Sequence, residues 1–160
     1  MSNSELDLPL SADFLSDSGH APVDLIRTLA VLSEAPASEH THLWNTLGIE
    51  ESPSASAYAD IFLFQLYPYA SVHLGPEGMV GGEAQNRVAG FWKALGMDPP
   101  PEPDHLASLL GLYATLSEQI ALMGETLGGR APFSEAEALM STQARDALLQ
   151  EHIAPWVPAY

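Results

Sequence analysis

The sequence predicts an all-α fold, a single-domain bundle of about six helices. Apolar residues recur at steps of three and four along most of the chain, which is the period of a helix face. No segment alternates apolar and polar residues beyond a few positions, and prolines and glycines separate the periodic segments. Because 160 residues suit one domain, we expect one helical domain over 21–160 after a flexible acidic tail over 1–20.

The first predicted helix starts at Pro22 and ends before Pro36, since the residue before a proline disfavours helical backbone. Four apolar residues are expected to form its buried face: Leu25, Ile26, Leu29 and Leu32. A short helix is predicted over 38–47, with Gly48 as its C-terminal cap.

A third helix is expected to start at the Ser52-Pro53 pair, which suits an N-cap and a first-turn position, and to end before Pro68. The stretch 67–82 holds two prolines and several glycines, so we expect a loop there. The next predicted helix spans 82–95, and the proline-rich segment 98–103 follows as a stiff spacer.

The longest predicted helix spans 104–127 and is apolar on nearly all sides, which predicts a central, buried position. Asp104 is an expected N-cap for it, and His105 would lie in its first turn. The last predicted helix continues to about His152 and begins with Ser134 and Glu137, the residues of a capping box.

The charge balance excludes several classes of partner. Acidic residues outnumber Lys and Arg by 21 to 5, which gives a net charge of −16. This charge argues against nucleic acid and anionic membrane surfaces, which need clustered basic residues. It is compatible with a cationic partner and equally with solubility alone. We find no signal peptide and no apolar stretch as long as a membrane span, and so expect a cytoplasmic protein without membrane insertion.

Catalytic and cofactor motifs are missing from the sequence. It has no cysteine, no phosphate-binding or dinucleotide-binding glycine motif, no Gly-x-Ser-x-Gly and no His-Glu-x-x-His. His40 and His42 are two residues apart and are expected to be solvated helix-surface side chains. We therefore expect no enzyme activity, no cofactor and no metal.

Two polar segments stand out from the helical pattern. The first is Asp104-His105 after the proline run, and its simplest interpretation is an N-cap followed by a first-turn residue. The second, residues 68–72, has the sequence Pro-Tyr-Ala-Ser-Val, and it reads either as a turn with a half-buried Tyr69 or as part of a peptide-binding groove.

The order of four segments resembles the TorD family, the cytoplasmic chaperones that mature molybdopterin-dependent oxidoreductases and that include the nitrate reductase delta subunits. The segments are 27–36, with Arg-Thr-Leu-Ala-Val-Leu and a later proline; 58–74, with Tyr-Ala-Asp-Ile-Phe and Pro-Tyr-Ala-Ser-Val; 102–106, with Glu-Pro-Asp-His-Leu; and 149–158, with His-Ile-Ala-Pro-Trp. Each is weak alone, but the four in this order and spacing are a fairly specific match.

The resemblance implies that the chain binds the N-terminal peptide of an oxidoreductase catalytic subunit, a twin-arginine signal in many members, without covalent chemistry. By the family's pattern the peptide site would include Tyr69, Ser71, Asp104 and His105, with Tyr58, Asp60 and Phe62 as neighbours. A basic, apolar leader suits an acidic chain with aromatic loop residues.

The chain departs from the family pattern in two places. The connection over 64–67 is short, and family members continue for a further helix or two after the Pro-Trp segment. The resemblance therefore leaves a monomer and a domain-swapped homodimer open. The alternative function is a small acidic helical subunit of a redox-enzyme complex with a purely structural role.

Overall fold

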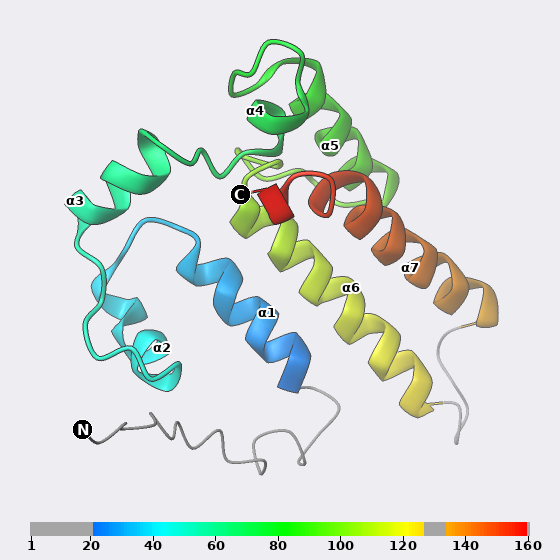
Figure 1. Ribbon diagram of the computed structural model, residues 1–160. Helices are drawn as coiled ribbons and strands as arrows, with labels where there is room; N and C mark the ends of the chain where they lie inside the picture. The colour runs from blue at the N-terminus through cyan, green and yellow to red at the C-terminus, as the bar shows by residue number, and fades with distance from the viewer. Residues whose placement is uncertain (1–20, 127–133, 160) are drawn as a thin grey trace, which may run out of the picture.

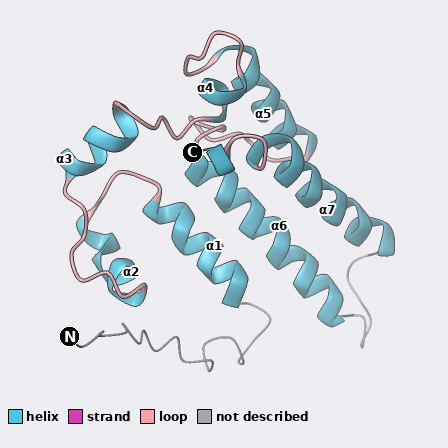
Figure 2. Ribbon diagram, viewed as in Figure 1, coloured by secondary structure: helices cyan, strands magenta, loops and turns pink. Residues whose placement is uncertain are grey.

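The computed structural model describes residues 21–126 and 134–159, and within this part it contains seven α-helices and no strand (Figures 1 and 2). The all-α prediction is therefore confirmed. The helices are α1 (Ala21–Leu32), α2 (Thr41–Thr46), α3 (Ala55–Tyr58), α4 (Ala70–Leu74), α5 (Gly82–Ala94), α6 (Leu106–Thr126) and α7 (Glu135–Ala147). The tail predicted over 1–20 lies outside the described residues.

Helix α6 lies at the centre, with α1 on one side and α7 on the other (Figure 1). Its buried residues form the core with residues of α4, α5 and the turns that follow α7. The core comprises Ala70, Val88, Trp92, Leu106, Leu109, Leu112, Leu116, Leu148, Ile153 and Trp156. The predicted central position of the longest helix is confirmed.

Part of α6, Leu106–Gly124, is long and apolar enough to cross a membrane, with a mean hydropathy of 1.3. The expectation that no stretch reaches this length is therefore wrong. In the bundle this segment packs against α1 and α7, and it contributes four residues to the core. Its apolar character follows from that central position, because a helix that has neighbours on several sides is apolar on several sides.

Helix α1 buries only part of the face that the sequence predicts. Leu32 is buried and Ile26 is half-buried, but Leu25 and Leu29 are exposed, and Val23 and Ala30 are buried in addition. The small side chain of Ala30 allows close approach to α6, whose buried residues include two alanines, Ala107 and Ala114. The apolar spacing in α1 therefore predicts the helix correctly but predicts only part of its buried side.

We call residues 37–67 the arm, because they contribute no residue to the core and run from the end of α1 through α2 and α3. Helix α3 begins two residues later than predicted, since Ser54 Oγ rather than Ser52 accepts the capping hydrogen bond, from Ala57 N at 3.1 Å. After one turn it widens into a π-helix over Ala59–Leu63, so the predicted regular helix to Tyr67 is wrong.

The region predicted as a loop over 67–82 contains the short helix α4. Helices α4 and α5 lie next to one another at one end of the bundle, and both supply residues to the core (Figure 1). The prolines and glycines flank α4 rather than interrupt it, and this is why a loop was expected.

The last helix begins where the sequence predicts. Ser134 and Glu137 form the capping box, and α7 continues as a π-helix over Leu148–Ile153. The Trp156 side chain is buried, donates Nε1–H to the His152 carbonyl at 2.7 Å and stacks on the His73 ring of α4. This turn therefore fastens the end of the chain to the core.

Candidate functional site

The two polar segments singled out in the sequence lie against one another. Ala70 N donates to the Asp104 carbonyl at 3.0 Å, and Leu106 N donates to the Pro68 carbonyl at 2.8 Å. These two bonds form an isolated antiparallel bridge between Tyr69 and His105. The backbone thus holds the start of α4 beside the start of α6, although the two segments are more than thirty residues apart.

Asp104 caps α4 and not its own helix, which corrects the sequence expectation. Its Oδ2 accepts from Ser71 N, in the first turn of α4, at 3.0 Å. The Ser71 hydroxyl accepts from Gly81 N at 3.0 Å. Both side chains are fully buried. In this conformation they support the site from behind and cannot touch a ligand in solvent.

His105 takes the N-cap position of α6 instead. Its Nδ1 lies 3.1 Å from Ala107 N, the second residue of α6, and must accept that hydrogen because the amide donates. The ring is therefore neutral, with its proton on Nε2. Burial lowers the pKa of His105, which agrees with this neutral form, although nearby Glu102, Glu34 and Asp104 act in the opposite direction.

Tyr69 is held by two contacts. Its hydroxyl donates to Glu102 Oε1 at 2.9 Å, and its ring meets the His105 ring edge-on with 4.9 Å between centroids. Burial, followed by the bond to Glu102, raises the pKa of Tyr69 to about 12. Tyr69 is thus a protonated donor at neutral pH, and it fixes the position of the Glu102 carboxylate.

A pocket of about 470 Å³ opens beside these residues, between the end of α1, helix α3 and the start of α6. We call it the acidic pocket. Its lining combines aromatic, acidic and small apolar side chains: Glu34, Ala35, Pro36, Ala55, Tyr58, Ala59, Leu63, Tyr69, Glu102, His105 and Ser108. Tyr58 joins two of these walls, because its hydroxyl donates to the Ser33 carbonyl at the end of α1 at 3.2 Å.

The structure brings three of the seven expected residues into this lining, namely Tyr58, Tyr69 and His105. Phe62 lies behind, with its ring 4.9 Å from that of Tyr58, and Asp60 is exposed outside the pocket. Ser71 and Asp104 are buried behind it, as described above.

Sequence reasoning missed both carboxylates of the pocket. Glu102 could have been found, since it directly precedes the Pro-Asp-His motif. Glu34 stands after the end of α1 and lines the pocket because the chain turns there before α2, which no local pattern reveals.

The electrostatics of the pocket favour a cation. Burial and then the charges of Glu102 and Glu34 raise the pKa of Tyr58, and the same two carboxylates oppose the lowering of the His105 pKa by burial. Two carboxylates beside two tyrosine rings can hold a guanidinium or ammonium group by ion pairing and by cation–π contact. Among the described residues no group of three or more His, Asp or Glu side chains could hold a metal ion.

The comparisons agree with this picture at the level of the family. The model of the family described as nitrate reductase delta subunit matches residues 33–160. Searches of curated proteins and of solved structures gave no match. The family match covers both segments that build the site and most of the helical bundle. The chain therefore belongs to the nitrate reductase delta subunit family, a family of molybdoenzyme maturation chaperones.

Proposed function

We propose that this chain is a cytoplasmic chaperone that binds the N-terminal peptide of a molybdopterin oxidoreductase catalytic subunit while the cofactor is inserted. The acidic pocket receives a basic side chain from the start of that peptide, a twin-arginine signal or a remnant of one. The action is reversible binding without covalent chemistry. The observation that carries the proposal is the pairing of Glu34 and Glu102 with two tyrosines in one pocket of a family member.

The chemistry of the pocket matches an arginine side chain better than a lysine. A guanidinium is planar, can lie on a tyrosine ring and can bond a carboxylate through two N–H groups. Glu102 is already oriented by the Tyr69 hydroxyl, so less conformational freedom is lost when a cation binds. The apolar lining from Ala35, Pro36 and Leu63 can cover the methylene stem.

Fluorescence anisotropy with a labelled twin-arginine peptide tests the proposal. We expect Glu34→Gln and Glu102→Gln each to weaken binding by about three- to tenfold, because each removes a charge and keeps the side-chain shape. Glu50→Gln is the matched control, since Glu50 is exposed in the arm and does not line the pocket. We also expect binding to weaken as salt is raised.

Two results would contradict the proposal. If the folded protein does not bind the peptide at high micromolar concentration, the structural-subunit alternative gains support. If the Glu34, Glu102 and Glu50 variants lose affinity equally, the peptide responds to net charge and not to the pocket. A control peptide with lysines in place of the arginines should bind more weakly to the native protein.

A further inference from the structure

The two carboxylates of the acidic pocket are held in different ways. Glu102 is exposed, yet it is bonded through both its side chain and its backbone: Oε1 accepts from the Tyr69 hydroxyl at 2.9 Å, and the carbonyl accepts from Ser108 Oγ at 2.7 Å. Glu34 is also exposed, but its carboxylate has no hydrogen bond or ion pair in the described part of the chain. One carboxylate is therefore fixed, and the other is free to turn.

The backbone at Glu102 is confined as well. Glu102 stands between Pro101 and Pro103, and a residue that precedes a proline disfavours helical backbone. Its carbonyl accepts a second, longer bond from His105 N at 3.3 Å. Ser108 is the third residue of α6, so its hydroxyl ties this turn to the start of the central helix. The base of the Glu102 side chain is thereby fixed relative to the core.

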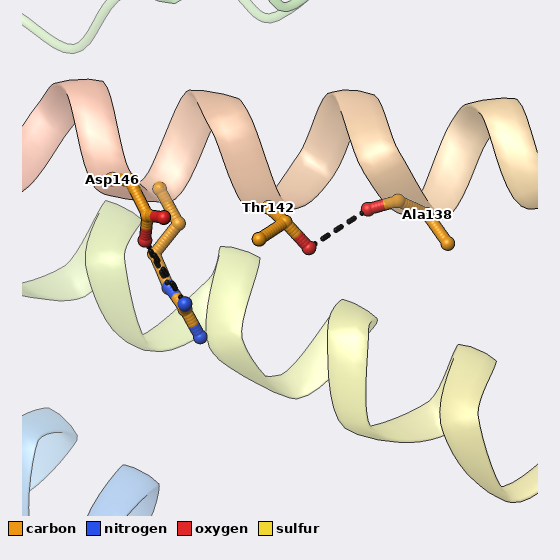
Figure 3. Close-up of polar contacts among 4 residues, drawn as sticks. Ala138, Thr142 and Asp146 are labelled. Carbon is orange, nitrogen blue, oxygen red and sulfur yellow. Dashed lines mark hydrogen bonds and ion pairs between the residues drawn. The ribbon is translucent and has the colours of Figure 1, made fainter.

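The pocket supplies no cation of its own to these carboxylates. Among the residues that the structure describes, its lining contains neither Lys nor Arg. Two of the five basic residues of the chain are paired elsewhere: Arg27 with Glu118 of α6 at 2.9 Å, and Arg145 with Asp146 within α7 (Figure 3). Both carboxylates of the pocket therefore remain open to a cation that a ligand brings.

A fixed carboxylate favours a guanidinium over an ammonium group. A carboxylate has about four lone-pair positions, and the Tyr69 bond uses one of those of Glu102. A guanidinium donates two parallel N–H bonds in one plane, so it gains from a carboxylate whose plane is already set. An ammonium group is a point charge with rotatable donors and can bind a carboxylate in many orientations. A carboxylate that is free to turn, such as that of Glu34, attracts both cations by its charge.

We infer that Glu102 determines the specificity of the acidic pocket for arginine, and that Tyr69 and Ser108 are the positioning residues that give Glu102 this role. Glu34 supplies charge that strengthens the binding of arginine and lysine alike. This inference rests on the proposed function and assigns different roles to its two carboxylates. It gives Ser108 a part in recognition through the backbone of Glu102, without a bond from its hydroxyl to the ligand.

The test compares two labelled peptides that differ at one pair of residues, Arg-Arg in one and Lys-Lys in the other. Fluorescence anisotropy gives the Kd of each peptide, and the ratio of the two Kd values measures the selectivity. We expect the native protein to bind the arginine peptide at least about fivefold more tightly than the lysine peptide. Glu34→Gln should weaken both peptides by a similar factor and keep this ratio, whereas Glu102→Gln should lower the ratio to less than about twofold.

Variants that leave Glu102 in place test the positioning residues. Tyr69→Phe keeps the ring and removes only the hydroxyl, and Ser108→Ala removes the hydroxyl that holds the Glu102 carbonyl. We expect each to lower the ratio at least about twofold by weakening the arginine peptide, with a smaller change for the lysine peptide. Ser108→Thr keeps a hydroxyl and should restore the ratio. Tyr67→Phe is the matched control, since this exposed tyrosine does not line the pocket.

The outcomes separate the inference from the function on which it rests. Equal affinity of the native protein for the two peptides would overturn the specificity and leave cation binding by the pocket in place. An equal loss of selectivity in Glu34→Gln and Glu102→Gln would overturn their different roles. A native ratio in Tyr69→Phe or Ser108→Ala would overturn the positioning role of that residue.

Failure of the native protein to bind either peptide would overturn the proposed function itself, and the inference with it. Circular dichroism and Tm of each variant show whether the fold is kept.

Discussion

The core half of the molecule, from Pro68 to Trp156, and the arm, residues 37–67, are packed very differently. Every residue of the core cluster comes from the core half. The arm buries only Tyr58 to a comparable degree and exposes a run of large apolar side chains: Leu47, Ile49, Ile61, Leu63, Phe64, Leu66 and Tyr67. The acidic pocket lies where the two regions meet, with walls from both of them and from the end of α1.

This difference suggests how the site works. Tyr69, Glu102 and His105 are fixed by hydrogen bonds within the core half, so they form a preformed wall of the acidic pocket. Tyr58 and Leu63 stand on a segment with few buried contacts, so that wall can adjust around a ligand at small cost. Each prediction below tests this division of roles.

The largest expected effect compares equal truncations in the two regions. Leu148→Ala removes a fully buried side chain of the core and should lower the free energy of unfolding by about 2–5 kcal/mol. Leu63→Ala removes a side chain that is 45% exposed in the arm and should cost less than about 1 kcal/mol. Urea denaturation measures both. Similar losses would show that the arm is as firmly packed as the core.

The next effect concerns the buried Asp104. Asp104→Ala leaves Ser71 N without its acceptor at the start of α4 and should destabilise the fold by about 1–3 kcal/mol. Asp104→Asn keeps an acceptor oxygen and should be much closer to the native protein. If Asp104→Ala instead abolishes peptide binding without lowering Tm, the side chain acts on the ligand and not on the fold.

A smaller effect is expected for the bond that joins the arm to the end of α1. Tyr58→Phe deletes the hydroxyl that donates to the Ser33 carbonyl, a contribution of about 0.5–1.5 kcal/mol. We expect faster amide hydrogen exchange over 55–63 with little change over 106–116. A uniform increase across the chain would mean that the arm and the core open together.

The smallest predicted effect is the pH dependence that His105 contributes. Burial lowers the pKa of this histidine from its ordinary value of 6.5, so below that value the unfolded chain binds more protons than the folded one. The contribution is fully present above pH 6.5 and is lost as the pH falls toward the folded pKa. Burial lowers the pKa of His152 as well. Protonation of this histidine therefore also lowers the stability of the fold as the pH falls.

Substitution isolates the share of His105. The amide oxygen of His105→Asn can still accept from Ala107 N but does not titrate, so Tm should fall less steeply between neutral and mildly acid pH than in the native protein. His42→Asn, at an exposed position, is the control. Parallel pH profiles for the native protein and His105→Asn would contradict the assignment.

The sequence predicts those parts of the fold that depend on local chemistry. The Ser134–Glu137 capping box and the Gly48 helix end are both present, since caps and left-handed turns are set by neighbouring residues. The burial of Val23 and Ala30 in α1 could not be predicted, because it depends on tertiary packing against α6.

The site is predictable only in outline. The family resemblance places Tyr69 and His105 in one site. Asp104, however, accepts a hydrogen bond from Ser71 of another helix. The local sequence around a capping carboxylate does not show which helix it caps. Glu34 enters the pocket only through the turn after α1. Long-range contacts of this kind need the structure.

Peptide-induced changes in the amide NMR spectrum of the native protein test the central claim most directly. With a saturating twin-arginine peptide, we predict that the largest shifts fall on both walls of the acidic pocket, over 55–63 and 102–108. The account would be contradicted if these residues were unperturbed and the shifts gathered elsewhere, for instance at the exposed Met79 and Val80.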